Sequence, residues 1–213
     1  DCLLSRGLGD VYKRQIILCC MRGNGNEREN EETIRIAAEF LSDSDGVVAV
    51  DLAGAEALFP TSDYEKLFAH ARAEGIPFTI HAGEAAGPES IRQAVDYGTA
   101  RIGHGVNCIH DKNLMNIIAE KGITLELCPT SNLNTKIVND IKDYPIDKII
   151  NNKIKVTINT DNMTVSGTDE ASEMKLICDT FGYDGNMRRI FVDNAIDAAF
   201  LSNEMKEKLR GNL

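Results

Sequence analysis

The stretch Phe78-Thr79-Ile80-His81-Ala82-Gly83-Glu84 is the part of this 213-residue sequence that most clearly indicates the fold. Its apolar and β-branched residues predict a buried strand. The strand ends at a histidine, and a carboxylate follows three residues later. In α/β proteins, ligands bind at the carboxyl ends of the strands. His81 and Glu84 are therefore candidates for chemistry.

Predicted strands and helices alternate on both sides of this stretch. Further apolar strands are predicted at 16–22, 47–52, 100–105, 123–128 and 154–158, and helices at 29–41, 63–74, 89–97, 112–120, 146–150, 170–181, 186–200 and 202–209. Strands that alternate with helices form parallel sheets. The predicted strands are mostly apolar, which is typical of parallel strands that are buried on both faces.

Two α/β architectures fit this order of elements. One is an open doubly wound sheet, and the other is a TIM-type (β/α)8 barrel of which about six units are present. No glycine-rich phosphate loop follows a predicted strand, which disfavours the nucleotide-binding sheet. In a barrel, the carboxyl ends of all strands face one site. The candidate residues at that edge are Gly54, His81, Glu84, His104, Asp161 and Asn162.

These residue types can together support hydrolysis at an electrophilic carbon. His81 and Asp161 are suitable ligands for Zn²⁺, which lowers the pKa of water and makes it a nucleophile. Glu84 in a dry pocket can hold and donate a proton. His104 lies between two glycines and can turn its imidazole toward the attacking water.

Each candidate also has a structural interpretation. His81 can be a hydrogen-bonded core histidine, Glu84 can cap the helix that follows it, and Asp161 can be a turn residue. His70 and His110 fall on predicted helical or loop surface, so neither is assigned to the site.

The composition limits the kinds of partner. The net charge of −10 and the pI of about 4.9 disfavour nucleic acid and anionic membrane surfaces. No apolar run reaches the roughly 20 residues of a membrane span. The six cysteines include no Cys-x-x-Cys pair, which is typical of reduced thiols. We therefore expect a cytoplasmic protein that acts on a small molecule.

Six motifs at predicted strand ends carry a more specific resemblance. They are Leu18-Cys19-Cys20-Met21-Arg22, Asp51-Leu52-Ala53-Gly54, His81-Ala82-Gly83-Glu84, Arg101-Ile102-Gly103-His104-Gly105, Cys128-Pro129-Thr130-Ser131-Asn132 and Asn159-Thr160-Asp161. In this order they resemble the adenosine deaminase family of the amidohydrolase superfamily. The resemblance implies a zinc-dependent barrel enzyme that deaminates adenosine, or 2'-deoxyadenosine, to inosine and ammonia, with metal-activated water attacking C6 of the purine.

The resemblance also implies roles for the site residues. His81 and Asp161 would be zinc ligands, and Glu84 would protonate the purine ring nitrogen next to the attacked carbon. His104 would take a proton from the attacking water. The backbone N–H of Gly54 would hold another ring nitrogen, and Asn162 would contact the five-membered ring.

The sequence departs from the family pattern in three places. It contains no His-x-His, the motif that supplies two further zinc ligands on the family's first strand. Asn162 replaces a second aspartate, which leaves the preferred purine open. Ala55 stands where an acidic residue is common. We expect residues 16–213 to form the carboxyl-terminal three-quarters of the barrel, without its first two units, and to be inactive alone.

Two alternative functions stay open, and the amino-terminal segment needs a separate interpretation. The enzyme can act on adenine or another 6-aminopurine instead of adenosine, or the chain can be a non-catalytic barrel fragment without metal. Residues 1–15 show no sustained period and resemble translated linker sequence. We expect this segment to be non-native or disordered.

Overall fold

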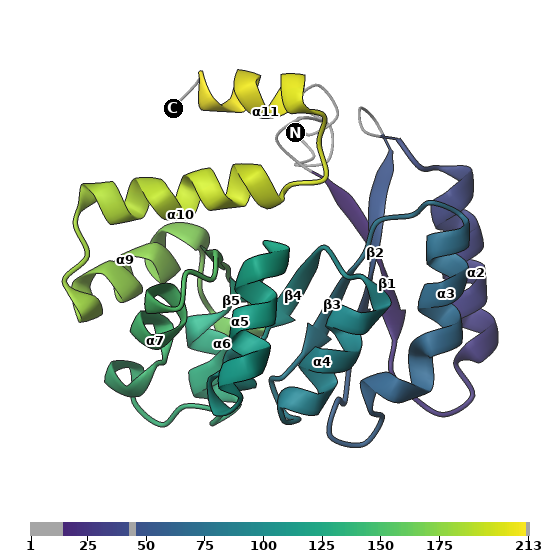
Figure 1. Cartoon of the computed structure of the whole chain (residues 1–213), viewed down its shortest axis with the longest axis horizontal. Coiled ribbons are helices and arrows are strands. Elements are labelled where there is room, and N and C mark those ends of the chain that lie inside the picture. The colour runs from purple at the N-terminus through teal and green to yellow at the C-terminus, as the bar shows by residue number, and fades with distance from the viewer. Residues whose placement is uncertain (1–14, 43–45, 212–213) are drawn as a thin grey trace.

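The computed structural model describes residues 15–42 and 46–211 and shows an α/β fold with parallel strands (Figure 1). The strands are β1 (Ile16–Met21), β2 (Val47–Ala53), β3 (Thr79–Ala82), β4 (Arg101–His104), β5 (Thr124–Leu127) and β6 (Val156–Ile158). β1 pairs with β2, and β3, β4, β5 and β6 pair in chain order. A parallel bridge between Val50 and Phe78 joins β2 to β3. The predicted incomplete TIM-type barrel is confirmed.

Helices cover the outer side of this partial barrel and the amino ends of its strands. The α-helices are α2 (Glu27–Glu39), α3 (Glu65–Ala73), α4 (Pro88–Tyr97), α5 (Lys112–Lys121), α6 (Pro129–Asn134), α7 (Ile146–Asn151), α8 (Met163–Ser166), α9 (Glu170–Phe181), α10 (Gly185–Ala198) and α11 (Asn203–Arg210), and the 3₁₀ helices are η2 (Thr61–Tyr64), η3 (Val106–His110) and η4 (Ile141–Asp143). Figure 1 shows α10 and α11 at the end of the sheet opposite the strand arrowheads. The carboxyl ends of the strands are therefore left for the connecting loops.

Aspartate side chains begin several of the helices. Asp111, Asp169 and Asp184 accept hydrogen bonds from backbone N–H groups in the first turns of α5, α9 and α10. Such caps satisfy N–H groups that have no partner within the helix. The order of strands and helices thus follows from apolar strand runs separated by capped helices.

The two faces of the sheet differ in polarity. Ile80, Ile102 and Leu125 pair in register on the outer face and are fully buried. One residue further along, His81, Gly103 and Glu126 form a row on the inner face. The expectation that the strands are apolar on both faces is therefore wrong. The inner face is polar because it lines a site, whereas the outer face forms the core beneath the helices.

Some predicted boundaries also differ from the structure. No helix is predicted between the strand at 123–128 and the helix at 146–150, but residues Pro129 to Asn134 form α6, a short polar helix without an apolar period. The predicted helix at 63–74 begins as the 3₁₀ helix η2 before α3. Short helices of this kind give little periodic signal, so tertiary contacts decide them.

The amino-terminal boundary stays a prediction. Residues 1–14 lie outside the described part of the chain. Gln15 pairs its side-chain amide with both backbone groups of Phe200, at 2.6 Å and 3.0 Å. Gln15 is thus tied to the connection between α10 and α11.

None of the helices within residues 15–42 and 46–211 combines the length and the apolar character that crossing a membrane requires.

Candidate active site

A cavity of about 340 Å³ lies against the inner face of the sheet. Its lining includes His81, Gly103, Glu126 and Asp161, which come from strands or from the residues that follow them. Two of the predicted site residues, His81 and Asp161, line this cavity. His104 lies beside both of them, and Glu84 lies beside His104, because parallel strands carry their carboxyl ends to one edge.

Three of these residues form a set of metal donors. One ligand atom from each of His81, His104 and Asp161 lies within 4.8 Å of the others. Two imidazoles and a carboxylate are the donor types that Zn²⁺ prefers. The spacing allows one ion to be reached by all three, so these residues fit a divalent metal.

His81 is oriented by Asp51. The Asp51 Oδ2 atom lies 2.8 Å from Nδ1 of His81, although not along the direction of a well-aligned hydrogen bond. This contact leaves Nε2 of His81 as the nitrogen available to a metal. Burial alone would lower the pKa of His81, but the neighbouring Asp51 carboxylate raises this pKa to about 9. A carboxylate behind a histidine is a common arrangement around zinc.

Replacing Gly103 by alanine is expected to displace the His81 ring. A Cβ atom at position 103 would lie 3.0 Å from Cγ and Nδ1 of His81. Overpacking of this kind costs about 1–3 kcal/mol, which urea unfolding would measure. Gly185→Ala at the start of α10 is the matched control, because its new methyl group meets nothing within 4 Å. Equal stability of the two variants would contradict the prediction.

His104 is almost fully buried and has a left-handed backbone, with φ at 60°. The amide nitrogen of Asn132 lies 3.1 Å from Nδ1 of His104, and the hydroxyl of Tyr144 donates to Oδ1 of Asn132. This chain of contacts turns Nε2 of His104 toward Glu84 and Asp161. Burial lowers the pKa of His104 below the usual value for histidine, although the Glu84 carboxylate opposes this effect.

Asp161 follows β6 and also has a left-handed backbone, with φ at 57°. The hydroxyl of Ser131 donates a hydrogen bond of 2.7 Å to its Oδ2 atom, which lies 4.0 Å from Nε2 of His104. A left-handed conformation is uncommon for residues other than glycine, although aspartate and histidine adopt it more readily than most side chains. Two such residues at one site indicate that the surrounding fold imposes their positions.

Glu84 faces the imidazole of His104 instead of capping a helix. Its Oε2 atom lies 3.6 Å from Nε2 of His104, and its Oε1 atom lies 3.4 Å from the hydroxyl of Thr135. The following helix, α4, begins after Gly87, without a side-chain cap. The structural interpretation of Glu84 as a cap is therefore wrong.

The structure places Gly54 and Asn162 at the same end of the sheet. Gly54 follows β2 with φ at 114°, and a Cβ atom there would lie 3.2 Å from Cβ of Arg22. This close approach gives a structural reason for glycine at this position. Asn162 begins α8, where its Oδ1 atom accepts the N–H of Val165. Its amide N–H₂ group is then the part that can be offered to a ligand.

Sequence reasoning assigned no role to three residues that support the site: Arg22, Asp51 and Glu56. Asp51 and Arg22 stand within the quoted motifs, and they could have been singled out as charged residues within or directly after apolar strand runs. Both are buried, with exposed fractions of 8% and 5%. Glu56 lies in a loop and has no comparable sequence signal. The two histidines excluded from the site are indeed elsewhere: His70 contacts Glu31 on the surface, and His110 is exposed in η3.

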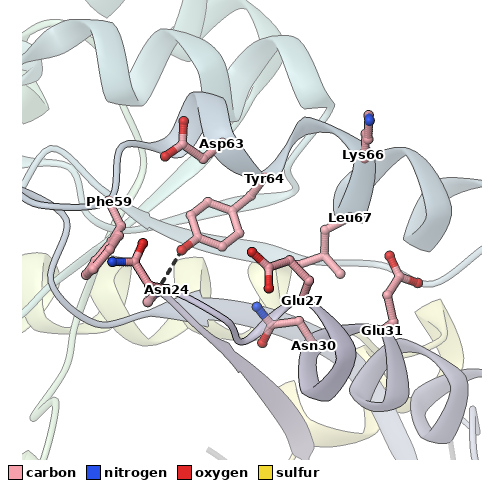
Figure 2. A pocket seen from close by; sticks show the side chains of 10 residues that line it. Asn24, Glu27, Asn30, Glu31, Phe59, Asp63, Tyr64, Lys66 and Leu67 are labelled. Carbon is pink, nitrogen blue, oxygen red and sulfur yellow. Dashed lines mark hydrogen bonds between the residues drawn. The ribbon is translucent and has the colours of Figure 1, made fainter.

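A second cavity, of about 280 Å³, lies between α2 and the η2–α3 segment (Figure 2). Its lining includes Asn24, Glu27 and Asp63, and the hydroxyl of Tyr64 accepts the backbone N–H of Gly23 there. It shares no lining residue with the 340 Å³ cavity. The donor atoms of His81, His104 and Asp161 thus belong to a separate site.

Comparisons with known proteins agree with this geometry. The family model described as adenosine deaminase matches residues 6–213. An adenosine deaminase from Haemophilus ducreyi is 45% identical over 204 residues, which are 95% of this chain and 59% of the relative. The chain therefore spans about 59% of the length of this curated relative.

Solved structures share the fold. An adenine deaminase from Arthrobacter aurescens superposes with a TM-score of 0.86 at 21% sequence identity, and the match covers 97% of this chain and 64% of the deaminase chain. An N6-methyl-AMP deaminase from Arabidopsis thaliana superposes with a TM-score of 0.82 at 27% sequence identity, and the match covers 92% of this chain and 57% of that deaminase chain. Together with the family match, these findings show that the chain belongs to the adenosine deaminase family.

Proposed function

We propose that this chain is the larger part of a zinc-dependent enzyme that deaminates adenosine, or 2'-deoxyadenosine, to inosine and ammonia. The observation that carries the proposal is the meeting of His81, His104 and Asp161 within 4.8 Å, with the Glu84 carboxylate 3.6 Å from His104. The identity of 45% to an adenosine deaminase supports the choice of substrate.

The donor set is suited to one zinc ion. His81 and Asp161 would hold it, with His104 at the edge of the same cluster. When bound, zinc supplies a Lewis acid that lowers the pKa of water toward neutrality. Two further histidine ligands are expected from the amino-terminal part of the barrel.

The residues around this position have distinct tasks in the proposed reaction. Glu84 donates a proton to the purine ring nitrogen beside C6, which ends the aromaticity of the ring and favours attack. His104 accepts a proton from the attacking water and orients it. Water adds to C6 and ammonia leaves, so that the amino group is replaced by oxygen.

Two residues are proposed to orient the purine. The backbone N–H of Gly54 donates to a second nitrogen of the six-membered ring. Asn162 donates an amide N–H to the five-membered ring, since its carbonyl oxygen caps α8. An amide donor needs no proton from solution, unlike a carboxyl group.

The test compares this chain with an extended protein. We define the extended protein as the chain from Ile16 to Leu213, with the first two strand–helix units of the Haemophilus ducreyi relative joined ahead of it. We expect the 213-residue chain to bind zinc weakly and to leave adenosine unchanged. The extended protein should bind one zinc and convert adenosine, as followed by ultraviolet absorbance.

The result against the proposal is equally clear. An extended protein that is folded by circular dichroism and holds one zinc, yet converts no 6-aminopurine, would overturn it. Adenine and N6-methyl-AMP belong in the same assay, because Asn162 leaves the preferred purine open. Faster turnover of either compound would move the assignment to another member of the same family.

A further inference from the structure

Glu84 lies in a turn whose backbone N–H groups all point to one carboxylate. The Oε1 atom of Glu56 accepts the N–H of Gly83 at 2.6 Å, and its Oε2 atom accepts those of Glu84, Ala85 and Ala86 at 3.0, 2.8 and 2.9 Å. Four consecutive N–H groups form a concave anion-binding surface. Glu56 fills this surface from the loop after β2.

The carboxylate is itself held in a buried polar network. The exposed fraction of Glu56 is only 5%, and the hydroxyl of Ser90 in α4 donates to its Oε1 atom. Ser90 contacts the hydroxyl of Thr61 at 2.7 Å, and Thr61 accepts a hydrogen bond from Arg22. The network therefore connects the loops after β1 and β2 to the helix that follows the turn.

The same network reaches the neighbouring metal-donor residue. The guanidinium of Arg22 donates to the backbone carbonyl of His81 at 2.6 Å. On the other side of the turn, the amide nitrogen of Asn107 donates to the carbonyls of Glu84 and Ala86 at 3.0 and 2.9 Å. Both the N–H and the C=O groups of the turn are thus fixed by side chains from other elements.

We infer that Glu56 is a positioning residue, whose carboxylate holds the turn from Gly83 to Ala86 and thereby places the Glu84 carboxyl group beside His104. This inference rests on the proposed function for its catalytic meaning. Glu56 does not reach the inner cavity, since all its contacts are to backbone N–H groups and to Ser90. It acts only through the turn.

The chemistry of the contacts requires a carboxylate at this position. The two oxygens of the Glu56 carboxylate accept hydrogen bonds from five donors. A glutamine has only one oxygen that can accept, and its N–H₂ group would face other N–H donors without a hydrogen bond between them. Burial would raise the pKa of Glu56, but the bonds from Ser90 and the backbone outweigh it and lower this pKa. The carboxylate is therefore charged at neutral pH.

The first measurement is hydrogen exchange on the whole 213-residue chain, which needs no activity. Glu56→Gln should increase exchange of the amides of residues 83–86 by about 10-fold or more, while amides of β5 and α5 keep their protection. Ser90→Ala removes one of the five donors to Glu56 and should give a smaller increase in the exchange of the same amides. This variant replaces Glu56→Gln in the measurement if Glu56→Gln fails to fold.

The second measurement is kinetic and uses the extended protein. Glu56→Gln should lower kcat about 100-fold, since a displacement near 1 Å has this effect, with KM within about 3-fold of the original value. Asp184→Ala is the control for stability alone, because it removes the carboxylate cap of α10, away from the turn. It should leave kcat unchanged.

The two measurements separate the possible failures. Unchanged exchange of residues 83–86 in Glu56→Gln, or increased exchange with an unchanged kcat, would overturn the inference. Equal losses of kcat in Glu56→Gln and Asp184→Ala would also overturn it. An extended protein that is inactive before any substitution would refute the proposed function, and the exchange measurement would still decide whether Glu56 holds the turn.

Discussion

Replacing Glu84 by glutamine is expected to lower kcat of the extended protein by about 10²–10⁴-fold, the usual contribution of a positioned proton donor. The glutamine side chain has the same shape but no acidic proton. KM should change little, because the contacts that bind the purine stay in place. Zinc content should also stay at its original value, since Glu84 is not among the three donor residues.

Glu89→Gln is the matched control for this result. Glu89 is an exposed carboxylate in the first turn of α4, five residues after Glu84. The same change of charge there should leave kcat within about 2-fold, as is usual for a surface substitution. A Glu84→Gln variant with kcat near that of Glu89→Gln would show that Glu84 is not the proton donor.

Replacing His81 by alanine is expected to weaken zinc binding by more than about 100-fold. Loss of a residue that only hydrogen-bonds a metal ligand typically costs about 10–100-fold, and loss of a ligand should cost more. Deamination by the extended protein should fall to background. The partly exposed His70 offers the control, because His70→Ala removes a histidine that contacts Glu31 on the surface. Metal analysis after dialysis, together with calorimetric titration, would measure both variants.

The pH dependence of zinc binding gives a second test of whether His81 is a zinc ligand. Its pKa is raised to about 9 without metal, so the ring is mostly protonated at pH 7. Zinc must displace this proton, and affinity should therefore rise with pH up to about 9. Calorimetric titrations in buffers of different ionisation enthalpy would count the protons released when zinc binds. Release of the same number of protons by the His81→Ala variant would contradict the assignment.

Much of the fold was predictable because each strand is marked by a local apolar run. His81, Glu84, His104 and Asp161 could be recognised since each follows or ends such a run, and parallel strands carry them to one edge. The polar inner face was not foreseen. Thr79, Arg101 and Glu126 contact one another across three strands, and only the register between strands shows that they share a face.

The supporting residues were hidden for a different reason. Glu56 lies in a loop, 27 positions before Gly83. Its partners in the turn are backbone N–H groups, which every residue except proline has, so the sequence does not mark them. Asn132 lies 28 positions after His104 and orients it from a helix without an apolar period. Contacts of this kind depend on tertiary geometry, which a pattern along the chain does not contain.

The left-handed backbones of His104 and Asp161 affect how mutational data at these positions should be interpreted. Asparagine tolerates this conformation, whereas a β-branched residue adds about 1–2 kcal/mol of backbone strain at one position. A valine at position 104 would therefore report strain and lost chemistry together. In a saturation library, asparagine and glycine are the substitutions that isolate what the imidazole or the carboxylate contributes.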